Sequence, residues 1–185
     1  MTDITKLLIA GQTCQQGQQQ TKADKYWKGS PFEWFRRLAS RSKGATGERM
    51  VADILEGNGS VVPRDPAGKP TKPKGSGTDF DIFPDNLPTE VKTSSAWEAT
   101  DNKFVWQQLR SKQKYERVVF LGLNASGAQA WWCTKGDLEQ HIFGRDEFRQ
   151  HAGKKGEQDL YWIHTEGGTV ASVPSWFRTM ETWHD

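Results

Sequence analysis

The stretch GTDFDIFPDNLPTEVKTS, residues 77–94, decides the fold and also carries the residues of chemical interest. Its segments DFDIF and TEVKT alternate apolar and polar side chains, and the segment PDNLP between them is rich in turn-forming residues. The sequence therefore predicts two adjacent strands joined by a tight turn. Successive side chains of a strand point to opposite faces, so Glu90 and Lys92 lie on one side while Val91 points into the core.

The first of these strands carries two acids, Asp79 and Asp81, which share a face and can converge with Glu90 on one point. Such a point binds a hard divalent cation, because Mg²⁺ prefers oxygen ligands and keeps several waters when one or two carboxylates hold it. The backbone carbonyl of Val91 could add a ligand. Lys92 would help to orient and deprotonate the attacking water, or stabilise charge on a phosphate. Metal-assisted phosphodiester hydrolysis uses all of these parts.

This stretch resembles the catalytic core of the PD-(D/E)XK, or restriction-endonuclease-like, nuclease superfamily. There an Asp on one strand and the E-x-K of the next form the metal site, on a helix-strand-strand-strand-helix-strand core. By this resemblance Glu90 and Lys92 are the E and the K of the motif. Asp79 is the favoured Asp because it follows Gly77 as the usual G-x-D entry to the strand, and Asp81 is the alternative.

The same resemblance implies supporting roles for two residues in neighbouring helices. Glu48 is similar to an acid that many of these nucleases place near the metal, although an acid near a helix N-terminus is also favoured by the helix dipole. Gln108 is expected on the apolar side of a helix with Val105 and Leu109, where it resembles a Gln that supports the active site. Gln107, or an ordinary surface position, is the alternative.

The order of the predicted elements indicates an α/β fold with a central mixed β-sheet flanked by helices, in a restriction-endonuclease-like arrangement. Pro84 and Asp85 belong to the turn rather than to the metal site. Residues 1–29 are predicted to be a mobile Gln-rich arm and residues 30–185 a single nuclease domain. The predicted helices are 31–40, 47–56, 103–114 and 137–143, and the predicted strands are 60–63, 79–83, 89–93, 117–123 and 128–134, with a short pair near 161–166 and 169–173.

Composition fits one domain of moderate size, with 35% hydrophobic and 26% charged residues, but a formal net charge of only +2 gives no argument for nucleic acid. The distribution of charge gives an argument for nucleic acid, because residues 22–49 hold eight Lys or Arg against three acids. Cys14 and Cys133 form neither a zinc motif nor a disulfide framework. The apolar run 7–10 is too short for a signal peptide or a membrane span, so a soluble cytoplasmic protein is expected.

Two basic segments are candidate DNA contacts. The loop from residue 64 to residue 74 opens toward the expected metal site, and its lysines would neutralise phosphates, although a surface loop without a ligand is equally expected. Residues 145–155 mix the side-chain types that read base edges. The candidates are Lys69, Lys72 and Lys74 in the first segment, and Arg145, Arg149, His151 and Lys154 in the second.

These expectations together predict an endonuclease of the type II restriction kind that cuts double-stranded DNA with Mg²⁺, which Mn²⁺ would replace. A homodimer is expected because one site cuts one strand and a two-fold partner would cut the other. A repair or junction-resolving nuclease of the same fold and a non-cleaving DNA-binding module are the alternatives.

Overall fold

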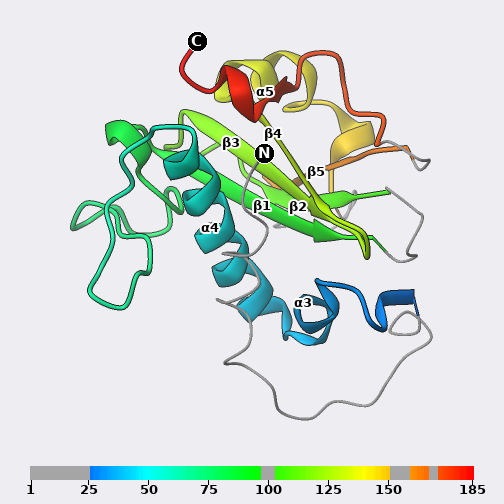
Figure 1. Cartoon of the computed structure of the whole chain (residues 1–185). Helices are drawn as coiled ribbons and strands as arrows, with labels where there is room; N and C mark the ends of the chain where they lie inside the picture. Colours follow the sequence, from blue (N-terminus) through cyan, green and yellow to red (C-terminus); the bar gives the residue numbers. More distant parts are fainter. Residues whose placement is uncertain (1–25, 97–102, 151–158, 167–170) are drawn as a thin grey trace.

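A four-stranded mixed sheet lies at the centre of the protein (Figure 1). The computed structural model describes residues 26–96, 103–150, 159–166 and 171–185. The strand order is β1 (Thr89–Ser95), β3 (Arg117–Leu123), β4 (Ala128–Thr134) and β6 (Arg178–Thr179). Strand β1 is parallel to β3, whereas β3 with β4 and β4 with β6 are antiparallel. The α/β class and the mixed sheet are therefore as predicted.

Helices cover both faces of this sheet. The helices α3 (Glu33–Arg37) and α4 (Ser40–Gly57) lie on one side, and α5 (Lys135–His141) follows β4 directly (Figure 1). Three short 3-10 turns connect the remaining segments, at Pro84–Asn86, Asp146–Phe148 and Met180–Thr182.

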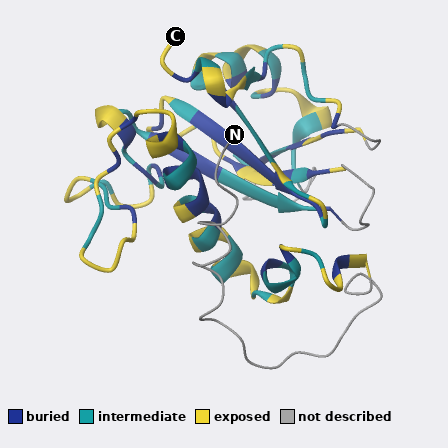
Figure 2. Ribbon diagram, in the orientation of Figure 1, coloured by how far each residue is buried: buried dark blue, intermediate teal, exposed yellow. Residues whose placement is uncertain are grey.

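Strand β3 separates two hydrophobic cores because its side chains alternate between the faces. Val119, Leu121 and Leu123 pack into the core beneath α3 and α4, whereas Val118 and Phe120 pack into the core beneath α5. Figure 2 shows β3 buried along most of its length and the long loop after α4 mostly exposed. The prediction that RVVFLGL is a strand buried on both faces is confirmed.

The predicted helix over 103–114 is wrong. Strand β2 (Val105–Leu109) occupies this segment and pairs antiparallel with β5 (Tyr161–His164) in a second, two-stranded sheet. The alternation of Phe104 and Trp106, both fully buried, sets the strand period, and Trp106 Nε1 donates a hydrogen bond to the carbonyl oxygen of Leu121 at 3.0 Å. Aromatic packing against β3 outweighs the local helical spacing of residues 105 and 109.

The predicted strands at 60–63 and 79–83 are not strands of a sheet, since residues 60–63 have no regular secondary structure and residues 79–83 include two bends. The second of them meets β1 in one isolated bridge, between Ile82 and Thr89. The predicted tight turn between residues 79–83 and β1 is confirmed. Asp85 in this turn lies in the left-handed region with φ of 50°, and its Oδ1 accepts a hydrogen bond from the backbone N of Val61 at 2.7 Å. Pro84 and Asp85 thus serve the turn, as predicted.

Helix boundaries differ from the predicted ones in three places. The helix predicted over 31–40 is the five-residue α3, Glu33–Arg37, and Ser40 already belongs to α4. Helix α4 begins at Ser40 rather than near Gly47, although its predicted end is confirmed by the cap at Asn58. Helix α5 begins earlier than residue 137, because the side chain of Thr134 accepts a hydrogen bond from the backbone N of Asp137 and forms a capping box with it. The described part of the predicted strand 169–173 contributes the isolated bridge between Glu166 and Ser172.

Packing of the body begins before residue 30. Trp27 is fully buried, and its Nε1 donates a hydrogen bond to the carbonyl oxygen of Ala96 at 3.2 Å. Residues 26–29 are therefore part of the packed body, while residues 1–25 of the predicted arm lie outside the described residues. Across the part of the chain that is described, no helix has the length and apolar character to cross a membrane.

Candidate active site

Strand β1 holds Glu90 and Lys92 side by side, as the alternation of a strand requires. Lys92 Nζ donates a hydrogen bond to Glu90 Oε1 at 2.6 Å, and the two side chains are 15% and 4% exposed. Val91 between them is buried in the core beneath α4. The predicted orientation of these three residues is confirmed.

Asp81 is fastened to the edge of β1 by backbone hydrogen bonds. The backbone N atoms of Asp81 and Ile82 both donate to the carbonyl oxygen of Thr89 at 3.0 Å. In return, the backbone N of Val91 donates to Asp81 Oδ2 at 2.9 Å. The N–H and C=O of one strand residue point to the same edge, so the carbonyl of Val91 faces the side where Asp81 lies.

Asp79 has different surroundings. It lies in the turn before this segment, where its backbone N donates to the carbonyl oxygen of Ser76, and its carboxylate pairs with Lys114 Nζ at 3.3 Å. The Glu90 carboxyl interacts with Lys92 and with Asp81. Of the two aspartates considered for the metal, the structure therefore brings Asp81 to Glu90, and Asp79 pairs elsewhere.

Glu48 approaches from α4. Its neighbour Gly47 lies so close to β1 that a Cβ atom there would stand 1.9 Å from Thr93 Oγ1. Burial raises the pKa of Glu48 to about 7, and the Asp81 carboxylate adds to the rise, while Lys69 and Lys72 oppose it. Helix α4 thus brings a third acid toward the edge of β1, as the resemblance implies.

Glu90 is the most deeply buried of these three acids. Burial raises its pKa to about 7, Lys92 opposes this, and Asp81 adds to it. Burial outweighs the ion pair with Lys92 because that pair leaves Oε2 buried without a hydrogen-bond partner among the described residues. Asp81, Glu90 and Lys92 are called the carboxylate site below, and Glu48 lies near Asp81 from the side of α4.

The carboxylate site fits a hard cation by its donor chemistry. Two neighbouring carboxylates repel each other unless a proton or a cation lies between them, and the open Oε2 of Glu90 is an oxygen donor of the type that Mg²⁺ prefers. The described residues contain no group of three or more His, Cys, Asp or Glu side chains arranged to hold a metal ion. An ion at this place would have Asp81, Glu90 and the carbonyl of Val91 as its donors from the chain, with water completing the shell.

The predicted lysines lie on the loop beside this site. Lys72 is half-buried, its Nζ donates to the carbonyl oxygen of Phe80, and it lies 5.5 Å from the centre of the Phe80 ring. Lys69 and Lys74 are exposed. Both Lys69 and Lys72 are near enough to Glu48 to lower its pKa, so this loop places positive charge near Glu48.

Gln108 differs from its predicted position, since no helix carries it. It is exposed, its φ is 60°, and the register of β2 shifts between Trp106 and Leu109 around it. Its backbone N donates to Gln150 Oε1 at 3.0 Å, and Gln150 Nε2 lies 3.4 Å from Gln107 Oε1. The two glutamines therefore pair with Gln150 on the surface of the second sheet.

The second predicted DNA-contact segment is described in part. Arg145 is exposed, and its Nη2 donates to the carbonyl oxygen of Gln140 at 3.1 Å. Arg149 Nε lies 3.2 Å from Asp146 Oδ1. His151 and Lys154 lie outside the described residues.

Sequence reasoning missed Tyr115 at this site. Tyr115 is buried, its hydroxyl donates to the carbonyl oxygen of Arg110 at 3.1 Å, and burial together with the nearby Glu90 raises its pKa. Its position just before β3 gives no local signal, because Tyr115 comes near Glu90 only when β3 pairs with β1.

Comparison of the chain with protein-family models, with curated proteins and with solved structures gave no match in any of the three.

Proposed function

We propose that the chain is a Mg²⁺-dependent endonuclease that hydrolyses phosphodiester bonds of double-stranded DNA on a PD-(D/E)XK core. One observation carries the proposal: the Glu90 carboxyl is bonded to Lys92 through Oε1, while its Oε2 is buried near Asp81 without a hydrogen-bond partner among the described residues. Buried carboxyls with raised pKa values and a defined charge partner are typical of catalytic sites. The E-x-K and its neighbouring Asp provide the parts for metal-assisted hydrolysis.

Each residue of the carboxylate site, like the nearby Glu48, has a distinct role in this proposal. Asp81, Glu90 and the carbonyl of Val91 would hold the ion, and Mg²⁺ or Mn²⁺, when bound, supplies positive charge that offsets the charge of the reacting phosphate. Lys92 keeps its ammonium next to Glu90 and stabilises negative charge that develops on the phosphate. Glu48, with its pKa raised to about 7, is suited to accept the proton of the attacking water.

The fold supports the core in part and departs from it in three segments, since residues 60–63 and 79–83 are not strands of the sheet and the described part of the connection from β1 to β3 lacks the implied helix. Helix α4, the edge segment with Asp81, β1 and the parallel strand β3 follow the order that the resemblance implies. The connection from β1 to β3 contains strand β2 instead of the implied helix. The proposal therefore rests on the site and on the β1–β3 pair rather than on the whole core.

Double-stranded DNA is the proposed substrate because Lys69 and Lys72 place positive charge near Glu48 and Lys74 is exposed on the same loop, and phosphate contacts by lysines supply most non-specific affinity. Arg145 and Arg149, with His151 and Lys154, remain candidate contacts to the bases. Cutting both strands would require two copies of the site, so a homodimer acting in the cytoplasm belongs to the proposal.

The test is cleavage of supercoiled plasmid with Mg²⁺, Mn²⁺, Ca²⁺ or EDTA. Nicking or linearisation with Mg²⁺ and Mn²⁺ alone is expected. The variant Lys92→Ala should lose about 10²–10⁴-fold in cleavage rate while its DNA affinity measured in Ca²⁺ stays within about threefold, since the ammonium acts on the reacting phosphate.

The exposed Glu139 on α5 provides a control, because Glu139→Gln changes one charge far along the chain from β1 and should cleave like the wild type. Absence of cleavage with every metal, together with firm DNA binding, would replace the proposal by a non-cleaving DNA-binding module. Strong preference for branched or mismatched DNA over linear duplexes would assign a repair role to the same chemistry.

A further inference from the structure

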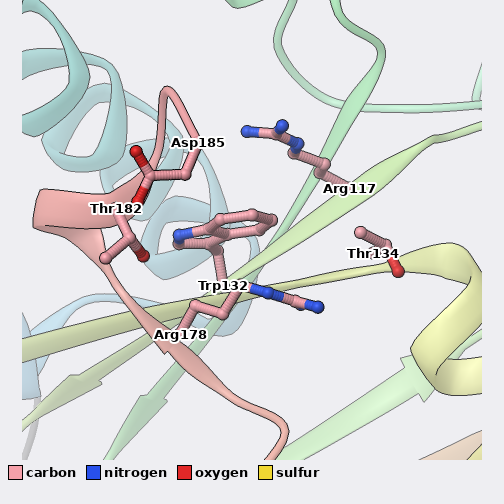
Figure 3. A pocket seen from close by; sticks show the side chains of 6 residues that line it. All are labelled: Arg117, Trp132, Thr134, Arg178, Thr182 and Asp185. Carbon is pink, nitrogen blue, oxygen red and sulfur yellow. The ribbon is translucent and has the colours of Figure 1, made fainter.

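A second charged hollow lies beside the opposite face of the sheet. Its volume is about 420 Å³, which is within the range of small-ligand sites. Residues that border it come from β3, β4, β6 and the C-terminal segment (Figure 3), and they are Arg117, Trp132, Thr134, Arg178, Thr182 and Asp185. This set is called the arginine pocket below.

The register of the sheet separates the arginine pocket from the carboxylate site. Arg117 pairs with Thr89, and the next residue, Val118, pairs with Glu90. Neighbouring residues of a strand point to opposite faces, so the side chain of Arg117 emerges on the face opposite to that of Glu90. Trp132, which Arg117 contacts, packs into the core beneath α4 and agrees with this placement.

Arg117 is held rigidly and carries an uncompensated charge. Its guanidinium lies 4.3 Å from the centre of the Trp132 ring and 4.7 Å from that of Trp183, and its Nη1 donates to the carbonyl oxygen of Trp183. Within the described residues no carboxylate oxygen lies within 4.0 Å of it, since it takes part in none of their ion pairs. Aromatic stacking of this kind fixes the planar fork before any ligand arrives.

Arg178 supplies a second guanidinium to the same hollow. It lies 4.8 Å from the Trp132 ring and forms an ion pair with Asp137, with Nη1 at 2.6 Å from Oδ2. Figure 3 shows Arg117 and Arg178 reaching the surroundings of Trp132 from different strands. Burial lowers the pKa of Arg117, and the charge of Arg178 lowers it further. The two cations therefore repel each other, and an anion bound at Arg117 would relieve this repulsion.

We propose that the arginine pocket binds the phosphate group of a nucleotide or of a nucleic-acid strand. Guanidinium groups match phosphate oxygens with paired, charge-assisted hydrogen bonds. A phosphate can accept hydrogen bonds from the Arg117 fork, and because it carries more negative charge than a carboxylate it gains more from the nearby charge of Arg178, whose own fork is bonded to Asp137. The pocket needs no metal, so this site is independent of the proposed cleavage chemistry.

Substitution of Asp185 tests the pocket in the direction opposite to substitution of Arg117, because it should strengthen phosphate binding. Asp185 borders the hollow, yet neither arginine has an ion pair with it within 4.0 Å among the described residues. A negative charge on the wall weakens binding of an anion without holding the arginines in place. Its removal should therefore strengthen phosphate binding, which a loss of folding could not do.

Calorimetric titration in EDTA, which removes divalent cations from the carboxylate site, tests the proposal. The probes are inorganic phosphate, deoxyadenosine monophosphate, a short DNA duplex and acetate. Arg117→Gln should weaken phosphate binding by about tenfold or more, the value of one charge-assisted hydrogen bond, and Asp185→Asn should strengthen it by about twofold to fivefold. Arg145→Gln, which changes an exposed arginine outside the pocket, should leave it unchanged.

Two outcomes identify the source of the phosphate. Weaker duplex binding by Arg117→Gln would assign a strand phosphate, and unchanged duplex binding with weaker monophosphate binding would assign a free nucleotide. The proposal would be overturned if wild type and Arg117→Gln bound inorganic phosphate and deoxyadenosine monophosphate equally tightly and Asp185→Asn also bound them with unchanged affinity. Acetate binding as tight as phosphate binding would overturn it as well, because the pocket would then be a carboxylate site.

Discussion

Asp81 and Asp79 are two residues apart, but their carboxylates have different partners. The carboxylate of Asp81 accepts a hydrogen bond from the backbone of β1, so the strand itself fixes it beside Glu90. The carboxylate of Asp79 pairs with Lys114, whose side chain is 81% exposed. Exposed pairs of this type contribute little to stability, so Asp79 is held loosely. The proposed metal-binding role is therefore assigned to Asp81 rather than to Asp79.

This difference predicts the outcome of a matched pair of substitutions. Asp81→Asn should reduce the plasmid cleavage rate in Mg²⁺ by about 10²–10⁴-fold, because it removes one of two carboxylates that hold the ion, a loss of several kcal/mol in the transition state. Asp79→Asn should stay within about threefold of the wild type. The single-turnover rate on one plasmid, with urea unfolding of each variant, measures both.

Asp85→Asn is the control for this pair, since Asp85 belongs to the same segment but binds the backbone of Val61. It should alter stability by about 1 kcal/mol and leave cleavage of the folded protein unchanged. The reverse order, with Asp79→Asn inactive and Asp81→Asn active, would return the ligand role to Asp79.

Single residues also show where sequence reasoning succeeds. Glu90 and Lys92 could be placed because alternation along one strand is a local rule, and it holds in β1. The choice of aspartate depended on where the preceding strand begins. Gly75 and Gly77 adopt positive φ values of 92° and 56°, so the chain is still turning just before Asp79. The G-x-D pattern favours Asp79, whereas the turn and the hydrogen bond from the backbone N of Val91 place Asp81 beside β1.

At the scale of elements, the contact of α4 with β1 positions the third acid. Gly47 is buried in this contact, whereas Gly44, in the same helix, is exposed and a Cβ atom there would meet nothing within 4 Å. The absence of a side chain at Gly47 lets the helix approach Thr93 closely and carries Glu48 toward Asp81.

Alanine at these two glycines should therefore have opposite effects. Gly47→Ala should lower the free energy of unfolding by about 1–3 kcal/mol, because the added methyl group clashes with Thr93 and forces α4 away from β1. Gly44→Ala should raise it by about 0.5–1 kcal/mol, since alanine is the better helix former. Urea unfolding of both variants measures the difference, and equal effects at the two positions would contradict a tight α4–β1 contact.

Elements were predictable from the sequence where one pattern dominates. The run RVVFLGL has no competing helical reading and forms β3, and the cap at residues 57–59 ends α4 as predicted. The segment at β2 has both a helical spacing, Val105 with Leu109, and a strand alternation, Phe104 with Trp106. The contact of Trp106 with Leu121 decides between them, and a contact between distant strands is invisible in a local window.

At the scale of the whole molecule, packing α4, the Asp81 segment and β1 together concentrates acids that water would otherwise solvate. Burial and the neighbouring Asp81 charge raise the pKa values of Glu48 and Glu90 to about 7. The folded protein consequently retains protons that the unfolded chain releases above about pH 4.5. Stability from these two groups is fully present below about pH 4.5 and is lost as the pH rises through about 7.

Magnesium should reverse this loss, because it binds only the ionised carboxylates and releases their protons. The rise in melting temperature caused by saturating Mg²⁺ is therefore expected to be small at about pH 6 and larger at about pH 8, with a midpoint near 7 set by Glu90. Thermal unfolding with and without Mg²⁺ across this range measures it. In Glu90→Gln the Mg²⁺-dependent rise in melting temperature should disappear at about pH 6 and at about pH 8, whereas Glu139→Gln should behave like the wild type. A rise in melting temperature that is independent of pH, or larger at pH 6, would show that Mg²⁺ does not bind at the buried carboxyl of Glu90.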